Sequence, residues 1–515
     1  METVDLESRQ KDYAVFLPAL SGFYATFVGK QRFAEYVDPA RIPAGFTNSV
    51  ESLNFLAPKD NVFRYPWALY SAGHANLDTT KLVEKEDMVR NRDRANTFLL
   101  GDSGGFQIAK GLWPGEWANP NCPKAAKQRK LVLDWMEEYM DYGMILDIPT
   151  WTFRDAKAAE ACGIRSYQDA VDATRINNDY FINNRKGNVK FLNVLQGGNH
   201  AEADDWYAMM KDYCDPSVYP DRHFNGWGMG GQNMCDVHLV LKRIVTLIHD
   251  GLLEKGLHDW MHFLGTSRLE WALLLTDIQR AVRKYHNPNF TISFDCASPF
   301  LATANGQVYT NNRIEDRGKW SYRMEPSIDD KKYAADTRLF SEVMKQDRGI
   351  DFLEGPVSRH LAINDVCIYK PGDLNKNGKE GKTSWDSFSY MLQMGHNVWA
   401  HLNAVQTANE EYDSGSVPAM LVDDRHDELF FRDLVDEIFG LQDREKSLQL
   451  IEEHSRFWMR VVGTRGFTGK RTMNSYTGFN SMFTVVEPAE PEQIDDVDFD
   501  DSKLDQLEDS QWQKY

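Results

Sequence analysis

Residues 97–107, TFLLGDSGGFQ, decide the fold, because a short apolar run ends there in a carboxylate, Asp102, followed by glycines. Residues 290–296, FTISFDC, repeat the apolar run and place Asp295 at its end. An acid directly past a strand lies where parallel α/β folds build their active sites. Two such acids predict a nucleophile and a general acid/base, whereas either one alone could equally cap a helix.

Four further segments follow the same pattern, at 145–149 (ILDIP), 191–195 (FLNVL), 226–229 (GWGM) and 262–264 (HFL). Apolar residues recur at helical spacing between them, in 204–213, 236–250 and 269–284. Strand, polar tip and helix repeated in this way predict an α/β fold of the TIM (β/α)8 barrel type. A doubly wound sheet is the alternative, but no GxGxxG opens a first βα unit.

These residues resemble the tRNA-guanine transglycosylase superfamily over roughly residues 60–400. The shared motifs are DSGGFQ (102–107), LDIPT (146–150), QGG (196–198), MGG (229–231), FLG (263–265) and FDC (294–296), in that order. The resemblance implies a TIM barrel that exchanges guanine in a nucleic acid for a 7-deazaguanine. It implies a pentosyltransferase that needs no cofactor.

Exchange of a base on an intact backbone breaks the N-glycosidic bond at C1′ and re-forms it on the same face. Double displacement through a carboxylate ester achieves this, as in retaining glycosidases. The resemblance implies that Asp295 attacks C1′. Asp102 would protonate the departing guanine and deprotonate the incoming base, which requires different pKa values for the two acids.

The other strand tips are expected to recognise the base. A carboxylate accepts two parallel donors, so Asp147 matches the N1–H and amine edge of a guanine-like ring. Gln196 would bond the O6 edge or serve as a turn residue, and Phe106 would stack on the ring or belong to the core. Gln232 replaces the apolar residue that often follows the two glycines in the family. The predicted substrate-binding residues are Ser103, Phe106, Gln107, Asp147, Gln196, Gly197, Gly230, Gly231, Gln232 and Gly265.

Metal sites are not expected. The superfamily commonly has a Cys-x-Cys-x-x-Cys knuckle with a later His, and here only Cys367 and His396 match, with Asp365 and Lys370 in place of cysteines. One thiolate and one imidazole do not complete a zinc site. Residues 373–378, DLNKNG, begin like a calcium loop, but its twelfth position is Ser384 instead of Glu, which predicts a polar turn. The remaining cysteines have no metal spacing and suggest reduced thiols.

Composition divides the chain into three parts. Residues 1–400 would form the barrel, 401–486 a mainly helical subdomain and 487–515 a disordered tail. The tail holds eleven Asp or Glu against two Lys, which is −9 of the net charge of −19. It is either a solvated tail or a competitor for the nucleic-acid groove. No apolar stretch of membrane-spanning length and no signal peptide are present, which predicts a cytoplasmic protein (in the host cytoplasm if phage-encoded).

Basic and aromatic residues alternate in 456–476, which suits phosphate and base contacts or a partly buried helix with its arginines at the surface. The missing zinc ligands make the chain more similar to the divergent branch that places 7-deazaguanines in DNA, found in bacterial modification islands and phages. The expected substrates are therefore DNA and a free base such as 7-cyano-7-deazaguanine. The alternatives are a tRNA-guanine transglycosylase with a degenerate zinc site and a non-catalytic nucleic-acid-binding subunit. A homodimer is possible.

Overall fold

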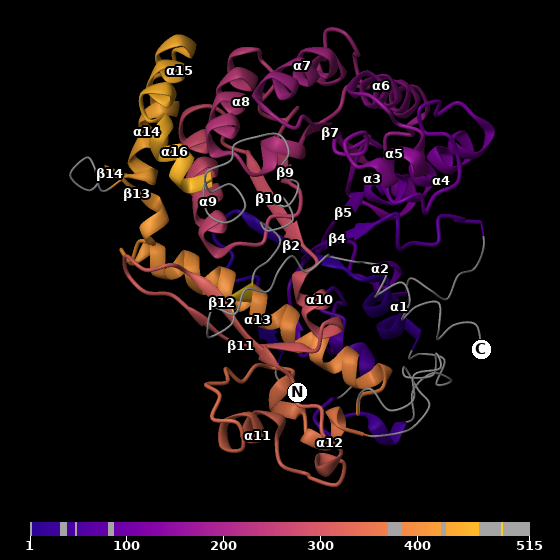
Figure 1. The fold of residues 1–515 in the computed structure, drawn as a ribbon, viewed down its shortest axis with the longest axis vertical. Coiled ribbons are helices and arrows are strands. Elements are labelled where there is room, and N and C mark those ends of the chain that lie inside the picture. Colours follow the sequence, from indigo (N-terminus) through magenta and orange to yellow (C-terminus); the bar gives the residue numbers. More distant parts are fainter. Residues whose placement is uncertain are drawn as a thin grey trace.

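Eight parallel strands close into a barrel in the computed structural model of the chain (Figure 1). The structure describes residues 3–30, 39–46, 49–80, 87–368, 384–423, 429–462 and 486–487. Each barrel strand pairs with the next in the chain, and β10 closes the ring on β2 with Ser293 opposite Val15. The strands are β2 (Val15–Leu20), β4 (Trp67–Ser71), β5 (Phe98–Asp102), β6 (Tyr142–Met144), β7 (Lys190–Leu195), β8 (Gly226–Met229), β9 (Trp260–Phe263) and β10 (Thr291–Cys296). Closure excludes the open doubly wound sheet.

Helices surround the barrel, as Figure 1 shows. Those up to the last barrel strand and directly after it are α1 (Gly22–Lys30), α2 (Asp87–Arg90), α3 (Gly105–Ala109), α4 (Pro123–Tyr139), α5 (Ala156–Cys162), α6 (Tyr167–Asn184), α7 (His200–Met210), α8 (Val237–His249), α9 (Leu269–Tyr285) and α10 (Ser298–Ala304). The three predicted helices correspond to α7, α8 and α9. In α8 the Asp236 side chain caps the first turn by accepting from Leu239 N–H, and Val240, Ile244 and Leu247 form a buried stripe.

The strand predicted at 145–149 is wrong in its position, because β6 ends at Met144 and residues 145–149 form a loop. Ile145 N–H still donates to the Leu192 carbonyl of β7 at 3.1 Å, and beyond it side chains of α6 bind the loop: Thr174 Oγ1 accepts from Ile148 N–H, and Asn177 Nδ2 donates to the Leu146 carbonyl. The loop carries Asp147 beyond the end of the barrel ladder.

Three aromatic residues fill the barrel interior at the amino-terminal ends of the strands. Phe98, Tyr142 and Trp260 are the first residues of β5, β6 and β9. The Phe98 and Trp260 rings stack with centroids 4.2 Å apart, although β5 and β9 are not neighbours in the sheet, and Tyr142 lies 5.4 Å from Trp260. This aromatic cluster closes the barrel at the amino-terminal ends of its strands. The barrel is therefore open only toward the carboxyl ends of the strands.

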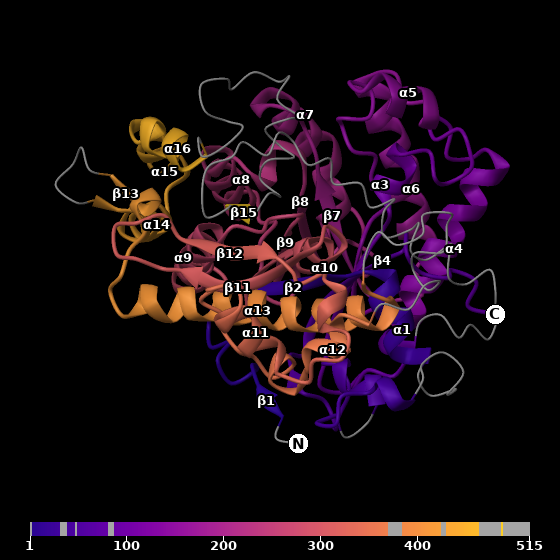
Figure 2. The ribbon, with the colours of Figure 1, turned by 60° about the horizontal axis from the view of Figure 1, so that its bottom comes forward.

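The segment after α10 adds an antiparallel pair, β11 (Gln307–Arg313) and β12 (Ser321–Pro326), which β15 (Val486–Glu487) extends. Two short helices follow, α11 (Phe340–Gln346) and α12 (Ile363–Val366), and then the long α13 (Ser387–Asp413). Helix α13 packs against α1, α9, α10 and β11, and Figure 2 shows it running below β11 and β12. The predicted domain boundary between residues 400 and 401 falls inside this helix.

Three further helices, α14 (Phe431–Gly440), α15 (Arg444–Glu453) and α16 (Ser455–Val462), lie against α8 and α9 (Figure 1). In α16, Phe457 and Trp458 are fully buried beside Phe431, and Arg460 pairs with Asp423 at 3.5 Å. The described part of the basic and aromatic segment therefore fits the partly buried helix. Residues 463–476 of this segment, and the acidic tail from residue 488 onward, lie outside the described residues. Two short pairs complete the fold: β1 (Val4–Asp5) with β3 (Phe63–Arg64), and β13 (Val422–Asp423) with β14 (Leu429–Phe430).

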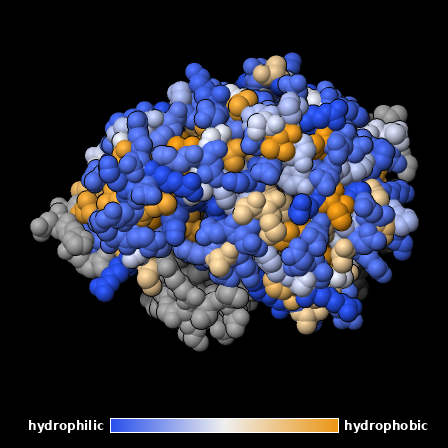
Figure 3. Space-filling view, turned by 90° about the horizontal axis from the view of Figure 1, so that it is seen from above, coloured by the Kyte–Doolittle hydropathy of each residue, from blue (hydrophilic) through white to orange (hydrophobic). Residues whose placement is uncertain are grey.

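Hydrophilic residues predominate on the face shown in Figure 3, where apolar residues form small separate clusters. Within the described ranges, no helix combines the length and apolar character needed to cross a bilayer.

Candidate active site

A cavity of about 620 Å³ opens at the carboxyl ends of the barrel strands, and residues at the ends of all eight strands line it. This is the end of a TIM barrel where active sites are built. Of the predicted site residues, the lining includes Asp102, Phe106, Gln107, Asp147, Gln196, Gly230, Gly231, Gly265 and Asp295. The described lining does not include Ser103, Gly197 or Gln232.

Asp102 is the last residue of β5 and lies opposite Ser71, the last residue of β4. The Ser71 hydroxyl donates to Asp102 Oδ2 at 2.6 Å. Burial raises the pKa of Asp102, and the nearby charge of Asp295 adds to this, against the opposite effect of the Ser71 hydrogen bond. A carboxyl group with a raised pKa holds a proton more readily, which suits a general acid.

The turn after Asp102 requires glycine. Gly104 has φ of +86°, and a Cβ there would come within 2.4 Å of the Trp113 ring. The turn leads into α3, which carries Gln107. Gln107 Oε1 is buried and has no hydrogen-bond partner in the described structure. Because Gln107 also lines the cavity, this oxygen is available to a donor on a bound ligand.

Asp295, near the end of β10, is held by two donors on one of its oxygens. Gly265 N–H donates to Oδ1 at 2.7 Å, and His262 Nε2 lies 3.1 Å from the same atom. Both partners come from β9 or the residues directly after it. Within the described residues, Oδ2 makes no hydrogen bond, so this oxygen is free to act as a nucleophile.

Asp147 and Gln196 form a buried pair at the cavity. Gln196 Nε2 donates to Asp147 Oδ2 at 2.7 Å. Burial raises the pKa of Asp147 to about 7, the Gln196 bond opposes this rise, and the charge of Asp102 adds to it. Gln196 was expected either to bond the O6 edge of the base or to be a turn residue. It directly follows β7, and its side chain donates to Asp147 at the cavity.

The Gly230-Gly231 segment brings backbone to the cavity. Gly231 has φ of +54°, and a Cβ there would meet Gly197 O at 2.4 Å. Gln232 is engaged within the protein: its N–H donates to Gly197 O at 2.7 Å, and its Nε2 donates to Asp236 Oδ2 at 3.1 Å. The backbone of Gln232 and the carbonyl of Gly197 therefore hold the loop together.

Aromatic and basic residues form the rim. Phe106 is half-buried and lines the cavity, and its ring centroid lies 6.1 Å from that of Trp151, which lines it too. The exposed Lys110 places Nζ 5.3 Å from the centre of the Phe106 ring. This placement favours ligand contact for Phe106 over a role in the core.

Sequence reasoning missed His262, Ser71 and Trp151 as site residues. His262 carried a signal, because a histidine within an apolar strand needs a buried partner. Ser71 and Trp151 carried none, because their importance arises from strands and loops that meet only in the folded barrel.

The residues at the positions of the family's zinc knuckle contact other groups of the protein. Cys367 Sγ donates to the Ile328 carbonyl, and His396 Nε2 contacts the Tyr309 carbonyl at 2.9 Å. Asp365 accepts from Ala362 N–H, whereas Lys370 and residues 373–383 of the calcium-like loop lie outside the described residues. Within the described ranges, no group of three or more His, Cys, Asp or Glu could hold a metal ion.

Comparison with models of protein families gives no match. A search among curated proteins gives none either. The chemistry of the cavity is the remaining guide to function. It presents Asp102 with a raised pKa, Asp295 with an oxygen free to attack, and the Asp147–Gln196 pair, which can bind the donor edge of a ring. This arrangement suits nucleophilic displacement with proton transfer.

Proposed function

We propose that this protein is a DNA-guanine transglycosylase that exchanges guanine in DNA for a free 7-deazaguanine base. The observation that carries the proposal is the position of Asp102 and Asp295 on one cavity that also holds the Asp147–Gln196 pair. Asp295 forms the ester with C1′, Asp102 moves the proton, and Asp147 with Gln196 binds the edge of the base.

The cavity offers room and chemistry for a base. Its volume of about 620 Å³ falls within the usual range for small-molecule sites. The half-buried Phe106 and Trp151 supply apolar ring faces, and Gln107 Oε1 supplies an unused acceptor. A guanine in duplex DNA must leave the stack to reach this depth, which costs a few kcal/mol.

The choice of DNA over tRNA depends on the sequence resemblance and on the replacement of zinc ligands by Asp365 and Lys370. Lys110 lines the cavity and is exposed, so its ammonium group is a cation that a phosphate of a bound nucleic acid could contact. Phosphate contacts would make binding weaken steeply with salt.

The test is incorporation of labelled guanine by the purified protein, with duplex DNA, single-stranded DNA and unmodified tRNA in parallel. We expect label in DNA and none with Asp295→Asn. Asp413→Asn is the matched control, since Asp413 lies away from the cavity lining and pairs with Arg280.

Three results would change the proposal. Label only in tRNA would replace DNA by tRNA as substrate. Exchange that persists in Asp295→Asn would remove Asp295 as nucleophile. Binding of nucleic acid without label in any substrate would favour a non-catalytic subunit.

A further inference from the structure

The barrel interior between β9 and β10 contains a column of polar contacts that leads to Asp295. Trp260 and His262 alternate on β9, as Ser293 and Asp295 do on β10, so each pair faces the same side of its strand. The register sets His262 beside Ser293. Both are fully buried. TIM barrels usually fill this space with branched apolar side chains, so a buried histidine here needs a specific reason.

The donor and acceptor capacity of each group shows which atom donates in each contact of the column. An indole N–H can only donate, so Trp260 Nε1, at 2.8 Å, makes Ser293 Oγ an acceptor. Ser293 Oγ can accept a second bond as well as donate, but the Asp295 carboxylate only accepts at His262 Nε2, so in the neutral ring the Ser293 hydroxyl donates to His262 Nδ1, also at 2.8 Å. A neutral imidazole that accepts at Nδ1 carries its proton on Nε2, the atom 3.1 Å from Asp295 Oδ1.

The base of the column is rigid, because the Trp260 ring belongs to the aromatic cluster at the closed end of the barrel. It stacks on Phe98 at an interplanar angle of 16°. The tautomer of His262 is therefore fixed between Asp295, which only accepts at Nε2, and the Ser293 hydroxyl, to which Trp260 donates.

We infer that His262 is a positioning residue for Asp295. Together with Gly265 N–H, it donates to Oδ1 and so orients the carboxylate for attack of Oδ2 on C1′. The inference rests on the proposed function. It adds a role for a residue that is buried behind the nucleophile and does not line the described cavity.

The same two donors serve both halves of the exchange. In the first, an Oδ2 electron pair forms the bond to C1′, the C1′–N9 bond breaks, and guanine leaves with the electrons of the C1′–N9 bond and takes up the proton of Asp102. In the second, N9 of the incoming base bonds to C1′, its proton passes to Asp102, and the C1′–Oδ2 electrons return to Asp295. Donors at Oδ1 orient the carboxylate in the first half and stabilise its returning charge in the second.

The experiment compares His262→Leu, His262→Gln and Ser293→Ala in single-turnover release of labelled guanine from DNA. Leu has no donor, and we expect its release rate to fall about 10- to 100-fold, as for loss of a hydrogen bond to a charged group. Gln offers an amide N–H near the position of Nε2 and should recover most of the rate. Ser293→Ala should lower the rate less, because it frees the tautomer without removing the imidazole.

A second readout separates positioning from general damage. The dissociation constant of the free base, measured by calorimetry without DNA, should stay at the wild-type value in all three variants, because the Asp147–Gln196 pair is intact. A wild-type release rate in His262→Leu would overturn the inference. So would a His262→Gln variant that folds as stably as wild type yet releases guanine no faster than His262→Leu.

Failure of the proposed function remains distinguishable. If the wild-type protein exchanges no base in any nucleic acid, the proposed function fails. The histidine tautomer can still be read by nitrogen NMR of protein labelled at histidine, with His262→Gln for assignment. A proton on Nε2 is expected, and a proton on Nδ1 of the neutral ring would overturn the inference without reference to activity.

Discussion

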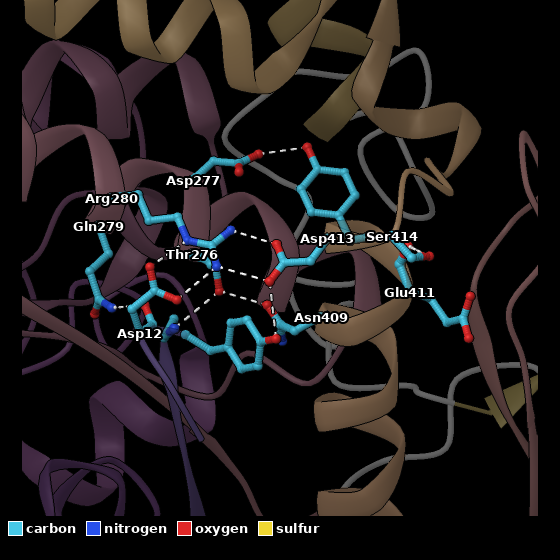
Figure 4. A network of polar contacts seen from close by, with 12 residues as sticks. Asp12, Thr276, Asp277, Gln279, Arg280, Asn409, Glu411, Asp413 and Ser414 are labelled. Atoms are coloured by element: carbon cyan, nitrogen blue, oxygen red, sulfur yellow. Dashed lines mark hydrogen bonds and ion pairs between the residues drawn. The ribbon is translucent and has the colours of Figure 1, made fainter. Parts of the chain in front are cut away.

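Two groups of aspartates in this molecule differ in the partners they have. The mouth aspartates line the cavity and are Asp102, Asp147 and Asp295. The lateral network joins the amino-terminal segment, α9 and the end of α13 (Figure 4), and consists of Asp12, Asp277, Arg280, Tyr412 and Asp413. In the lateral network, the Arg280 guanidinium bonds both carboxylates of Asp12 and Asp413 at 2.7–3.1 Å.

The mouth aspartates have no such partner. Within the described residues, none of them forms an ion pair with Lys or Arg, and their donors are a serine, a glutamine, a histidine and backbone amides. Buried carboxylates without a cation destabilise a protein. Acids paired with a cation therefore stabilise the fold, whereas the mouth aspartates, which have no cation partner, are candidates for catalysis or ligand binding.

Asp277 shows that the pKa alone would not separate the two groups. Burial raises its pKa to about 7, as it does for Asp147. However, Asp277 accepts the Tyr412 hydroxyl at 2.7 Å, and the charges of Arg432 and Arg280 oppose the rise. The neighbouring cations, and not the pKa value, mark it as structural.

The largest expected effect concerns the proton at Asp102. Asp102→Asn cannot give a proton to the departing guanine, and we expect exchange to fall about 10²- to 10⁴-fold. Asp413→Asn, a substitution of the same kind in the lateral network, should leave the exchange rate within about twofold, because it lies outside the cavity lining. Equal losses in the two variants, measured with labelled guanine, would remove the distinction between the groups.

The next effect concerns base capture. Ionised Asp147 accepts donors from the base, and its pKa of about 7 means that the empty cavity holds it protonated at lower pH. The affinity for free base should therefore weaken about tenfold for each pH unit below 7. Asp147→Asn should bind about 10- to 100-fold more weakly at pH 8 and lose this pH dependence. Calorimetric titration at pH 6 and pH 8 measures the affinity for free base and its pH dependence. An unchanged affinity in the variant would contradict the role of Asp147.

A smaller effect is expected in the lateral network. Arg280→Gln should lower the free energy of unfolding by about 1–2 kcal/mol, since Arg280 is partly exposed and solvent screens its pairs. Arg280 lowers the pKa of Asp12, so this stability is present above the unfolded pKa of about 3.9 and is lost as the pH falls through the lower folded value. Urea unfolding at pH 7 in low and high salt should show a loss that shrinks with salt. No loss at low salt would contradict a stabilising network.

The smallest effect has the opposite sign. Because the folded pKa of Asp147 is raised, its ionisation destabilises the protein as the pH rises from about 4 to about 7, and the full penalty applies above 7. Asp147→Asn should therefore be more stable than wild type by about 1 kcal/mol at pH 8, and by less at pH 5. Thermal unfolding at the two pH values tests this, and a variant less stable than wild type at pH 8 would place Asp147 with the structural acids.

The barrel was predictable where apolar runs end in glycine or an acid, as at β5 and β10. Strand β2 was not, because Pro18 lacks an N–H and argues against an interior strand, yet here it pairs opposite Cys296 at the end of the ladder. Strand β4, WALYS, has no β-branched residue and is too short to distinguish from a buried helical turn. Its register places Ser71 against Asp102, which no local pattern shows.

The site was predictable in its acids and less so in their partners. Asp102 and Asp147 follow apolar runs, so each could be inferred from its own segment. The contacts that distinguish them cross between strands: Ser71 to Asp102, Gln196 to Asp147 and His262 to Asp295. Pairings of this kind depend on strand register and barrel closure, which arise only when the whole chain folds.

The most direct test of the central claim is isolation of the covalent intermediate. DNA incubated with the protein in the absence of free base should release guanine and leave a protein–DNA adduct that survives denaturation, with the sugar attached to the peptide containing Asp295. The adduct should be lost in Asp295→Asn and retained in Asp413→Asn. Label on another residue, or exchange without any adduct under single-turnover conditions, would contradict the account.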